Sequence, residues 1–195
     1  TVTLREIFDE DLGDVYYFLS ENFDPELELN EWHLAFNHSW MPEKPNNGFM
    51  LVVNNTVVGV LCALYAQQQT QEGIRNVCNT STWFVLDAYR SHSLKLMAAI
   101  LDQKGFVFTS LSASAQVYEL HRRFGFRSYV TTLVAIPNLP KLNYFSRRLE
   151  ILVDAKSIGR YLDSHIKQIS IDHMDIPTVQ QVVFSNFDET LVIIY

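Results

Sequence analysis

Hydrophobic and polar residues alternate over residues 2–7, which predicts a first strand. Two amphipathic helices are predicted after it, one beginning near residue 12 and one over residues 27–40. Two apolar runs, residues 49–53 and 57–65, flank an Asn-Asn-Thr segment, and an Asn pair is typical of a tight hairpin turn. The polar residues that follow, 67–76, are expected to form a loop or a strand extension.

The stretch from residue 81 to residue 101 predicts a strand followed at once by a helix. Residues 83–86 are a short, β-favouring apolar run, and Ser91 and Ser93 in the polar turn after it can each act as an N-cap. Apolar residues then recur at helical spacing at positions 94, 97, 98 and 101. Gly105 marks the end of this helix.

A helix that starts directly after a strand presents backbone N–H groups at one point, and such a point attracts phosphate. Arg90, His92 and Lys95 add positive charge to this turn in a chain whose formal charge is −7. The turn is therefore predicted to be an anion site for a pyrophosphate.

This order of strand, Tyr-Arg, turn and helix resembles the acyl-CoA-binding motif of the GNAT superfamily of N-acetyltransferases, Gln/Arg-x-x-Gly-x-Gly/Ala. Here the motif reads Arg90-x-x-Ser93-x-Lys95, so the arginine matches and both small positions differ. Glycine at those positions lets the backbone approach the phosphates closely. A lysine at position 95 can pair with a phosphate or crowd the pocket.

A second segment, residues 114–126, resembles the family's second motif, a short helix that ends in Gly-Phe. Relatives often have an asparagine at its start and a tyrosine four residues before the glycine. Ser114 and His121 stand at those two positions, and Tyr118 lies one turn before His121 on the same helical face. Strands are predicted before and after this helix, over residues 106–111 and 128–136. The resemblance covers about residues 1–137.

The resemblance implies an α/β (α+β) fold with a mixed, mostly antiparallel central sheet and helices on both faces. It also implies that the fourth and fifth strands splay apart, so that acyl-CoA enters the wedge and its pantetheine arm pairs with the fourth strand near Val85. His121 and Tyr118 are the catalytic candidates. The cofactor-binding candidates are Val85, Leu86, Arg90, Ser91, His92, Ser93, Leu94, Lys95 and Ser114.

The function implied is transfer of an acyl group, in the first instance acetyl from acetyl-CoA, to a primary amine by direct attack. A nearby tyrosine or histidine can return a proton to the departing thiolate. Glu72 and His38 are looser candidates for a base, and a water chain is an alternative. Two other interpretations stay open: a GNAT-like module that binds a ligand or a partner without chemistry, favoured by Ser93 and Lys95, and an unrelated α/β domain.

Composition narrows the remaining choices. Hydrophobic residues make up 48% of the chain and charged residues 19%, which is enough for a sizeable core. The charge of −7 argues against general nucleic-acid binding and favours a small cationic amine as acceptor. No apolar run reaches the roughly 18 to 20 residues of a membrane span. Cys62 and Cys78 are too few for a disulfide scaffold or a zinc site, so no metal is expected and a cytoplasmic location is predicted. A homodimer is left open.

Residues 138–195 differ in character from the rest and are predicted to be a C-terminal extension or the beginning of a second domain. Strands are predicted over residues 149–153, 179–184 and 190–195, and a helix over residues 157–167. A turn is expected at residues 186–189. This part contains no chemical motif, and the sequence shows no internal repeat.

Overall fold

The computed structural model describes residues 1–24, 26, 28–36, 43–129, 150–153, 162, 164–174, 176, 179–185 and 190–194. The chain divides into two compact units, Thr1–Val130 and Thr131–Tyr195, called unit 1 and unit 2 below. The boundary predicted at residue 137 lies outside the described residues, so it stays a prediction.

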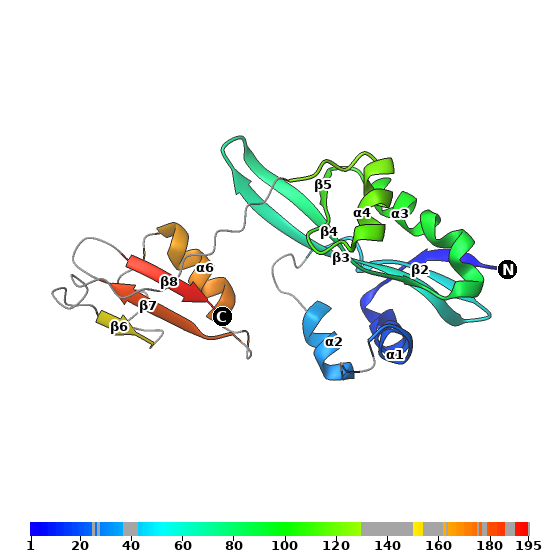
Figure 1. The fold of residues 1–195 in the computed structure, drawn as a ribbon, viewed down its shortest axis with the longest axis horizontal. Helices are drawn as coiled ribbons and strands as arrows, with labels where there is room; N and C mark the ends of the chain where they lie inside the picture. Colours follow the sequence, from blue (N-terminus) through cyan, green and yellow to red (C-terminus); the bar gives the residue numbers. More distant parts are fainter. Residues whose placement is uncertain are drawn as a thin grey trace. The chain divides into compact units, whose positions relative to one another are not determined.

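Unit 1 contains a five-stranded sheet in the order β1-β2-β3-β4-β5 (Figure 1). Its strands are β1 (Thr3–Glu6), β2 (Gly48–Val53), β3 (Thr56–Thr70), β4 (Gly73–Val85) and β5 (Phe106–Thr109). Its helices are α1 (Leu12–Asn22), α2 (Leu29–Phe36), α3 (Ser93–Leu101) and α4 (Ala115–Arg123), with 3-10 turns η1 (Asp9–Asp11) and η2 (Asp87–His92). Only the β4–β5 pair is parallel, so the predicted mixed, mostly antiparallel sheet is confirmed.

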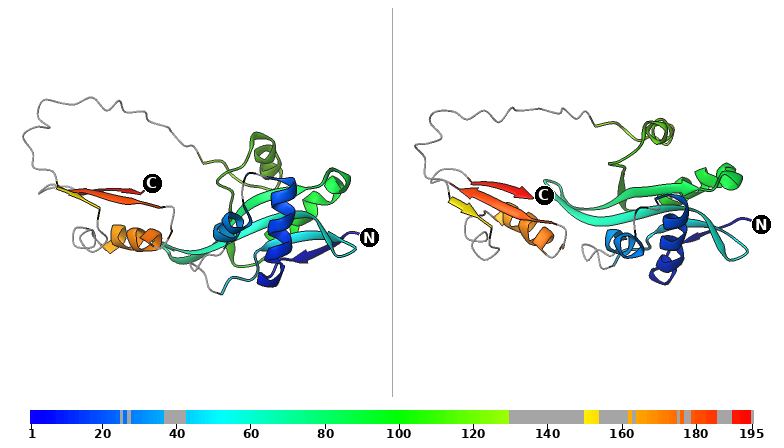
Figure 2. Two further views of the ribbon diagram at one scale, coloured as in Figure 1. Left: turned by 90° about the horizontal axis from the view of Figure 1, so that it is seen from below. Right: turned by 60° about the horizontal axis from the view of Figure 1, so that its bottom comes forward.

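Helices cover both faces of this sheet, as predicted. Figure 2 shows α1 and α2 on one face and α3 on the other. Val15, Leu19 and Trp32 pack with Met50 and Val60 on the first face. On the second face the buried side chains of α3 pack with those of β2 and β3; they are Leu96, Met97, Ile100, Leu51 and Leu61. Burial of each such side chain contributes about 1.5–3 kcal/mol, which explains why the helices dock.

The predicted hairpin between β2 and β3 is confirmed. Asn54 and Asn55 have φ of 48° and 62°, the left-handed conformation that an asparagine pair tolerates in a tight turn. Residues 67–76 turn out to be a strand extension rather than a loop, because β3 and β4 stay paired as far as Thr70 and Gly73.

Gly48 is the glycine that the packing of this sheet requires. Its φ is +113°, and a Cβ atom there would lie 2.2 Å from the carbonyl oxygen of Leu61. Gly73 has almost the same φ, +114°, with nothing within 4 Å of such a Cβ. The two glycines therefore share a backbone conformation that other residues rarely adopt, but only Gly48 also lies where a side chain would clash.

Several predicted boundaries differ from the structure. The second helix is described from Leu29 to Phe36, and residues 37–40 of its predicted span lie outside the described residues. β5 ends at Thr109 because the chain then leaves the sheet. Residues 128 and 129 are not in a strand, and the rest of the strand predicted to residue 136 is not described. Leu94 is 48% exposed, since α3 buries Leu96 instead.

Unit 2 has a three-stranded antiparallel sheet in the order β6-β7-β8 and one described helix. Its elements are β6 (Glu150–Leu152), α6 (Ser164–Met174), β7 (Gln181–Ser185) and β8 (Thr190–Ile194). The three strands were predicted, but the described helix begins at Ser164 and continues past the predicted end at residue 167. The turn predicted at residues 186–189 is not described. No helix in the described part of the chain is long and apolar enough to cross a membrane.

Candidate active site

The sheet of unit 1 opens where β4 and β5 separate. The two strands pair only from Asn76 to Asn79 on β4, opposite Phe106 to Thr109 on β5. The Thr80 hydroxyl donates to the Thr109 carbonyl at 3.2 Å, just past the last pair. β4 continues to Val85, whereas the chain after Thr109 turns away through a serine-rich loop toward α4. From Thr80 onward, β4 thus has no described strand on this side, and its backbone groups are available to a ligand.

A β-bulge lies on β4 inside this wedge. Leu61 pairs with Trp83 and Cys62 pairs with Ser81, which leaves Thr82 as an extra residue. Thr82 has φ of +42°, an unusual conformation for a β-branched residue. Bulges and strained residues concentrate at functional sites, where they direct backbone groups out of the regular ladder.

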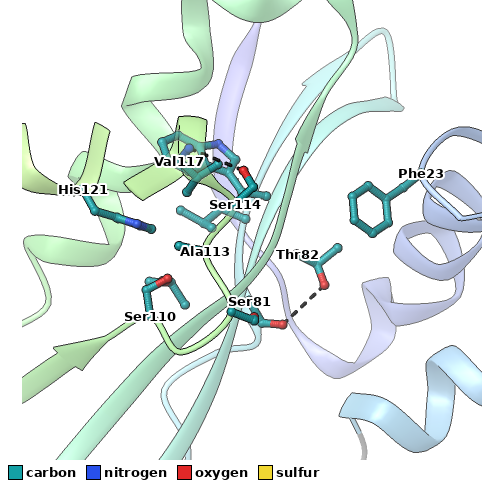
Figure 3. A pocket seen from close by; sticks show the side chains of 12 residues that line it. Phe23, Ser81, Thr82, Ser110, Ala113, Ser114, Val117 and His121 are labelled. Carbon is teal, nitrogen blue, oxygen red and sulfur yellow. Dashed lines mark hydrogen bonds between the residues drawn. The ribbon is translucent and has the colours of Figure 1, made fainter. Parts of the chain in front are cut away.

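A pocket of about 350 Å³ occupies the wedge (Figure 3). Half of its wall is made of hydroxyl-bearing residues, namely Thr80, Ser81, Thr82, Ser110, Ser112 and Ser114. The apolar part of the wall is Phe23, Leu61, Trp83, Ala113 and Val117. The remaining lining residue is His121, whose imidazole is the one acid–base side chain in this wall.

His121 reaches the pocket from α4. The Ser114 hydroxyl caps this helix by accepting from the Val117 N–H, which sets the direction of the helix at the pocket. His121 is 5% exposed, and its ring lies 4.7 Å from the Phe126 ring and 6.1 Å from the Trp83 ring, centre to centre. Its buried Nε2 has no hydrogen-bond partner among the described residues. Burial lowers the pKa of the imidazole below its ordinary value of 6.5, so the ring is neutral at pH 7.

Tyr118, the other catalytic candidate on α4, is 40% exposed and is not part of the pocket wall. The structure therefore brings His121 and Ser114 to the wedge together and leaves Tyr118 on the helix surface. Of the looser candidates for a base, Glu72 lies at the β3–β4 hairpin and pairs with Arg75, and His38 is outside the described residues.

The predicted helix start after β4 is present, but its serine caps are not. α3 begins at Ser93 with His92 in the N-cap position, and no side chain caps it. The prediction that Ser91 or Ser93 caps this helix is wrong because η2 runs directly into α3. The Ser93 N–H donates to the Arg90 carbonyl, so the backbone supplies the acceptor that a cap would offer.

The charged groups at this turn face solvent. The Arg90 side chain is 71% exposed and forms an ion pair with Asp87 at 2.9 Å, and Ser91, Leu94 and Lys95 are also exposed. Lys95 therefore does not plug this turn, and none of residues 87–95 lines the pocket in the wedge. Val85, in contrast, is buried against Gly59, so that only its backbone could contact a ligand. Leu86 is partly buried, and its N–H donates to the Val58 carbonyl at 3.0 Å.

Most of the hydroxyl wall was not predicted from the sequence. The signal was visible in two serine- and threonine-rich segments, residues 79–82 and 109–114. The first segment lies inside β4, where its pairing with β5 ends, and the second runs from the end of β5 to the start of α4, so the β4–β5 wedge brings the two together. Phe23 lies on the side of Ser81 and Thr82 that is opposite His121 (Figure 3), and it packs edge-on against Trp32 and Phe84.

Metal binding and thiol chemistry are the two other kinds of reactivity that the described residues could offer. No group of three potential metal ligands occurs in the described part of the chain. Cys62 and Cys78 are both buried and free, and burial raises the pKa of each thiol to about 12. Neither thiol is therefore a nucleophile at neutral pH. The arrangement that remains is a free strand edge, a hydroxyl-lined pocket and one neutral imidazole, which suits recognition of an extended amide and transfer of a proton.

No known sequence family and no curated protein matches this chain, but solved structures do. A transcriptional regulator from Bacillus halodurans C-125 is similar with a TM-score of 0.51 and 17% identity, over 70% of this chain and 99% of that one. The aminoglycoside N-acetyltransferase AAC(6')-Iy, in complex with CoA, is similar with a TM-score of 0.52 and 16% identity, over 71% of this chain and 96% of that one. Glucosamine-6-phosphate N-acetyltransferase from Arabidopsis thaliana is similar with a TM-score of 0.50 and 9% identity, over 71% of this chain and 99% of that one. The fold predicted from the sequence motifs is confirmed by these similarities.

Proposed function

We propose that this chain, which has the fold of the GNAT N-acetyltransferases, is an acyl-CoA-dependent N-acyltransferase that acts on a primary amine. The observation that carries the proposal is the wedge between β4 and β5. It combines an unpaired strand edge, a bulge at Thr82 and a pocket that contains a single neutral imidazole, His121. The fold alone would not support an activity, because one fold hosts many functions.

The wedge suits the acyl-pantetheine arm of the co-substrate. Pantetheine is an extended chain with two amide groups, and the edge of β4 from Thr80 to Val85 offers backbone donors and acceptors in a row. The diphosphate would then lie at the start of α3, where Arg90 and Lys95 provide positive charge and the helix dipole favours an anion. Acetyl-CoA is the acyl donor that we propose to test first.

His121 is proposed to move the proton in this reaction. The acceptor reacts as the neutral amine, which forms when the bound ammonium releases one proton to solvent. The amine nitrogen then attacks the thioester carbonyl carbon, the new C–N bond forms, and the C–S bond breaks. One proton leaves the nitrogen and one proton must reach the CoA sulfur. A neutral imidazole can accept the first proton and, as imidazolium, donate it to the thiolate. The pocket wall contains no carboxylate that could take the first proton instead.

The acceptor is proposed to approach from the side of Phe23. This ring is 46% exposed at the end of α1 and contacts Trp32 and Phe84, so it gives the pocket an aromatic rim. Aromatic faces attract cations, and the net charge of −7 favours a positively charged amine in the same way.

The proposal is tested by acyl-CoA binding and turnover. Saturating acetyl-CoA should raise the melting temperature of the protein, because a ligand that binds only the folded state stabilises it. Release of the CoA thiol is then followed with a panel of small cationic amines, and each amine is also tested without protein. Arg90→Ala should reduce the thermal shift, whereas Arg75→Ala is the matched control, because Arg75 pairs with Glu72 at the same spacing on the distant β3–β4 hairpin.

A second candidate is a GNAT-like module that binds a ligand or a partner without chemistry. It is favoured by the Arg90–Asp87 ion pair, because the guanidinium that would bind a phosphate is already paired with a carboxylate. It is also favoured by Ser93 and Lys95, which stand where the family motif has glycine and glycine or alanine. One of the similar structures is a transcriptional regulator, so the fold also occurs outside named acetyltransferases. Absence of a thermal shift with acetyl-CoA and with longer acyl-CoAs would select this candidate.

A further inference from the structure

Two polar groups in the wall of the wedge pocket are at least partly buried and make no hydrogen bond within the described part of the chain. One is the Nε2 atom of His121, which is only 5% exposed, and the other is the hydroxyl of the half-buried Ser110. Ser112, the other wall residue with an unpaired hydroxyl, is exposed. The wall hydroxyls that already have a partner are those of Thr80, Ser81, Thr82 and Ser114. His121 and Ser110 are therefore the shielded groups of this wall that are left to bind a ligand.

Both groups are held in place by their surroundings. Ser110 directly follows β5, and the neighbouring Thr109 accepts from the Thr80 hydroxyl at 3.2 Å and donates to the Asn79 side-chain oxygen at 3.1 Å. His121 is held by the two aromatic rings beside it. Figure 3 shows Ser110 and the His121 ring on the same side of the pocket. A water molecule commonly bridges two polar groups that lie too far apart for a direct hydrogen bond.

The wall of the pocket also suits water. Half of the lining residues carry a hydroxyl, and none of them carries a carboxylate or another charged group. A primary amine with a pKa near 10.4 is neutral in fewer than about one in a thousand molecules at pH 7, and this wall has no anion that would hold the charged form. Water is neutral at every pH, and an opening that admits an amine also admits water. An active site that protects a thioester from hydrolysis has to exclude water, and a wall rich in hydroxyls does not favour that exclusion.

We propose that the same pocket also hydrolyses acyl-CoA, with a water molecule held between Ser110 and His121 as the nucleophile. This inference rests on the acyl-CoA binding proposed above. When the ring proton of His121 is on Nδ1, Nε2 accepts one O–H of the water, and the Ser110 oxygen accepts the other. The lone pairs of the water oxygen are then free to attack. Ser110 is thus a positioning residue, and His121 is the general base.

The reaction balances without any further reagent. The water oxygen attacks the thioester carbonyl carbon, a C–O bond forms, and one water proton moves to Nε2 of His121. The tetrahedral intermediate then expels the CoA sulfur, so the C–S bond breaks, and the imidazolium gives its proton to the thiolate. The products are the CoA thiol and a carboxylic acid, which releases a proton to solvent at neutral pH. His121 ends the cycle in its neutral form.

The inference is tested by giving the full chain acetyl-CoA without an amine. Acetate is measured by NMR and the CoA thiol with a colorimetric reagent. Both are measured at saturating acetyl-CoA, so that a change in affinity does not alter the rates. The wild-type protein should form the two products in equal amounts, faster than buffer alone.

Four variants separate the roles of the two residues. His121→Phe should lower the rate of hydrolysis at least about a hundredfold, because the general base is lost. Ser110→Ala should lower it about five- to tenfold, because one hydrogen bond to the water is lost. Ser110→Thr keeps the hydroxyl and should retain most of the wild-type rate. Ser20→Ala is the matched control and should hydrolyse at the wild-type rate, because this hydroxyl bonds to the Tyr17 carbonyl within α1, outside the pocket.

The outcomes distinguish this inference from the proposed N-acyl transfer. A thermal shift with acetyl-CoA, or an N-acetyl product, without acetate above the rate in buffer would overturn the inference and leave the N-acyl transfer intact. Acetate without an N-acetyl product from any amine would support the inference and count against the amine acceptor. If there is no thermal shift and neither product forms, both are overturned. Wild-type hydrolysis in Ser110→Ala would also overturn the inference, because the water would then not depend on this hydroxyl. If Ser110→Ala does not fold, Ser110→Gly takes its place.

Discussion

Replacement of His121 by phenylalanine tests the proposed reaction most directly. Phenylalanine keeps the aromatic ring that lies between Phe126 and Trp83 and removes both ring nitrogens. Because the buried Nε2 has no partner among the described residues, the substitution breaks no hydrogen bond at that atom. An apolar ring also removes the cost of burying an unsatisfied polar atom. We therefore expect the free energy of unfolding to change by less than about 1 kcal/mol, or to rise.

The expected effect on catalysis is much larger. A positioned acid–base group contributes about 10²- to 10⁴-fold to a rate, which corresponds to roughly 3–5 kcal/mol of the barrier. Turnover of His121→Phe should fall by that factor. Affinity for acetyl-CoA should change little, because the strand edge and the start of α3, rather than the imidazole, are proposed to hold the co-substrate.

The assay combines three measurements on the same protein preparations. Release of the CoA thiol reports turnover, the acetyl-CoA thermal shift reports binding, and urea unfolding reports stability. Tyr118→Phe on the exposed side of the same helix is the matched control and should keep wild-type turnover. Wild-type turnover in His121→Phe would remove this residue from the mechanism and refute the proton-transfer argument.

The pH dependence gives a second, independent test of the same residue. Burial lowers the pKa of His121, so in acid the unfolded chain takes up this proton more readily than the folded chain. The stability that comes from the neutral, buried ring is therefore complete above pH 6.5 and is lost as the pH falls through the lowered pKa. His121→Phe lacks this loss, so the variant should gain stability relative to wild type on acidification. Parallel stability curves for the two proteins would contradict the assigned burial.

Three further predictions concern the helix start and the backbone. Arg90→Glu should weaken acetyl-CoA binding at least about tenfold while costing below about 1 kcal/mol of stability, because its ion pair is exposed; Arg75→Glu should leave the thermal shift unchanged. Gly48→Ala should lower the free energy of unfolding, measured in urea, by at least about 2 kcal/mol more than Gly73→Ala does, because only at position 48 would the added Cβ atom clash with backbone atoms. Equal losses in the two variants would refute this argument. Ser114→Ala should cost about 0.5–1 kcal/mol and lower the melting temperature.

Local patterns predicted most elements of unit 1 because each depends on neighbours in the sequence. Asn54 and Asn55 form the predicted turn since asparagine tolerates left-handed φ, whatever the rest of the chain does. Ser114 caps α4 for an equally local reason. The Ser91 and Ser93 prediction failed because a preceding 3-10 turn already supplied the acceptor, and that turn depends on how the chain leaves β4.

The candidate site was predicted in part. His121 was found because it stands at a fixed distance before the Gly-Phe pair, which is a pattern within one helix. The hydroxyl wall was missed because Thr80 and Ser110 are thirty residues apart and become neighbours only where two strands diverge. The bulge at Thr82 also has no sequence signature, since it depends on the register against β3.

The amino-acid order thus establishes the succession of strands, turns and helices and the family resemblance, because periodicity and turn chemistry act over a few residues. Tertiary contacts alone decide that β4 and β5 part after Asn79, that His121 is buried beside the resulting pocket, and that unit 2 pairs its strands in the order β6-β7-β8. Each of these depends on long-range pairing and packing, whose free energy is gained only when distant segments meet.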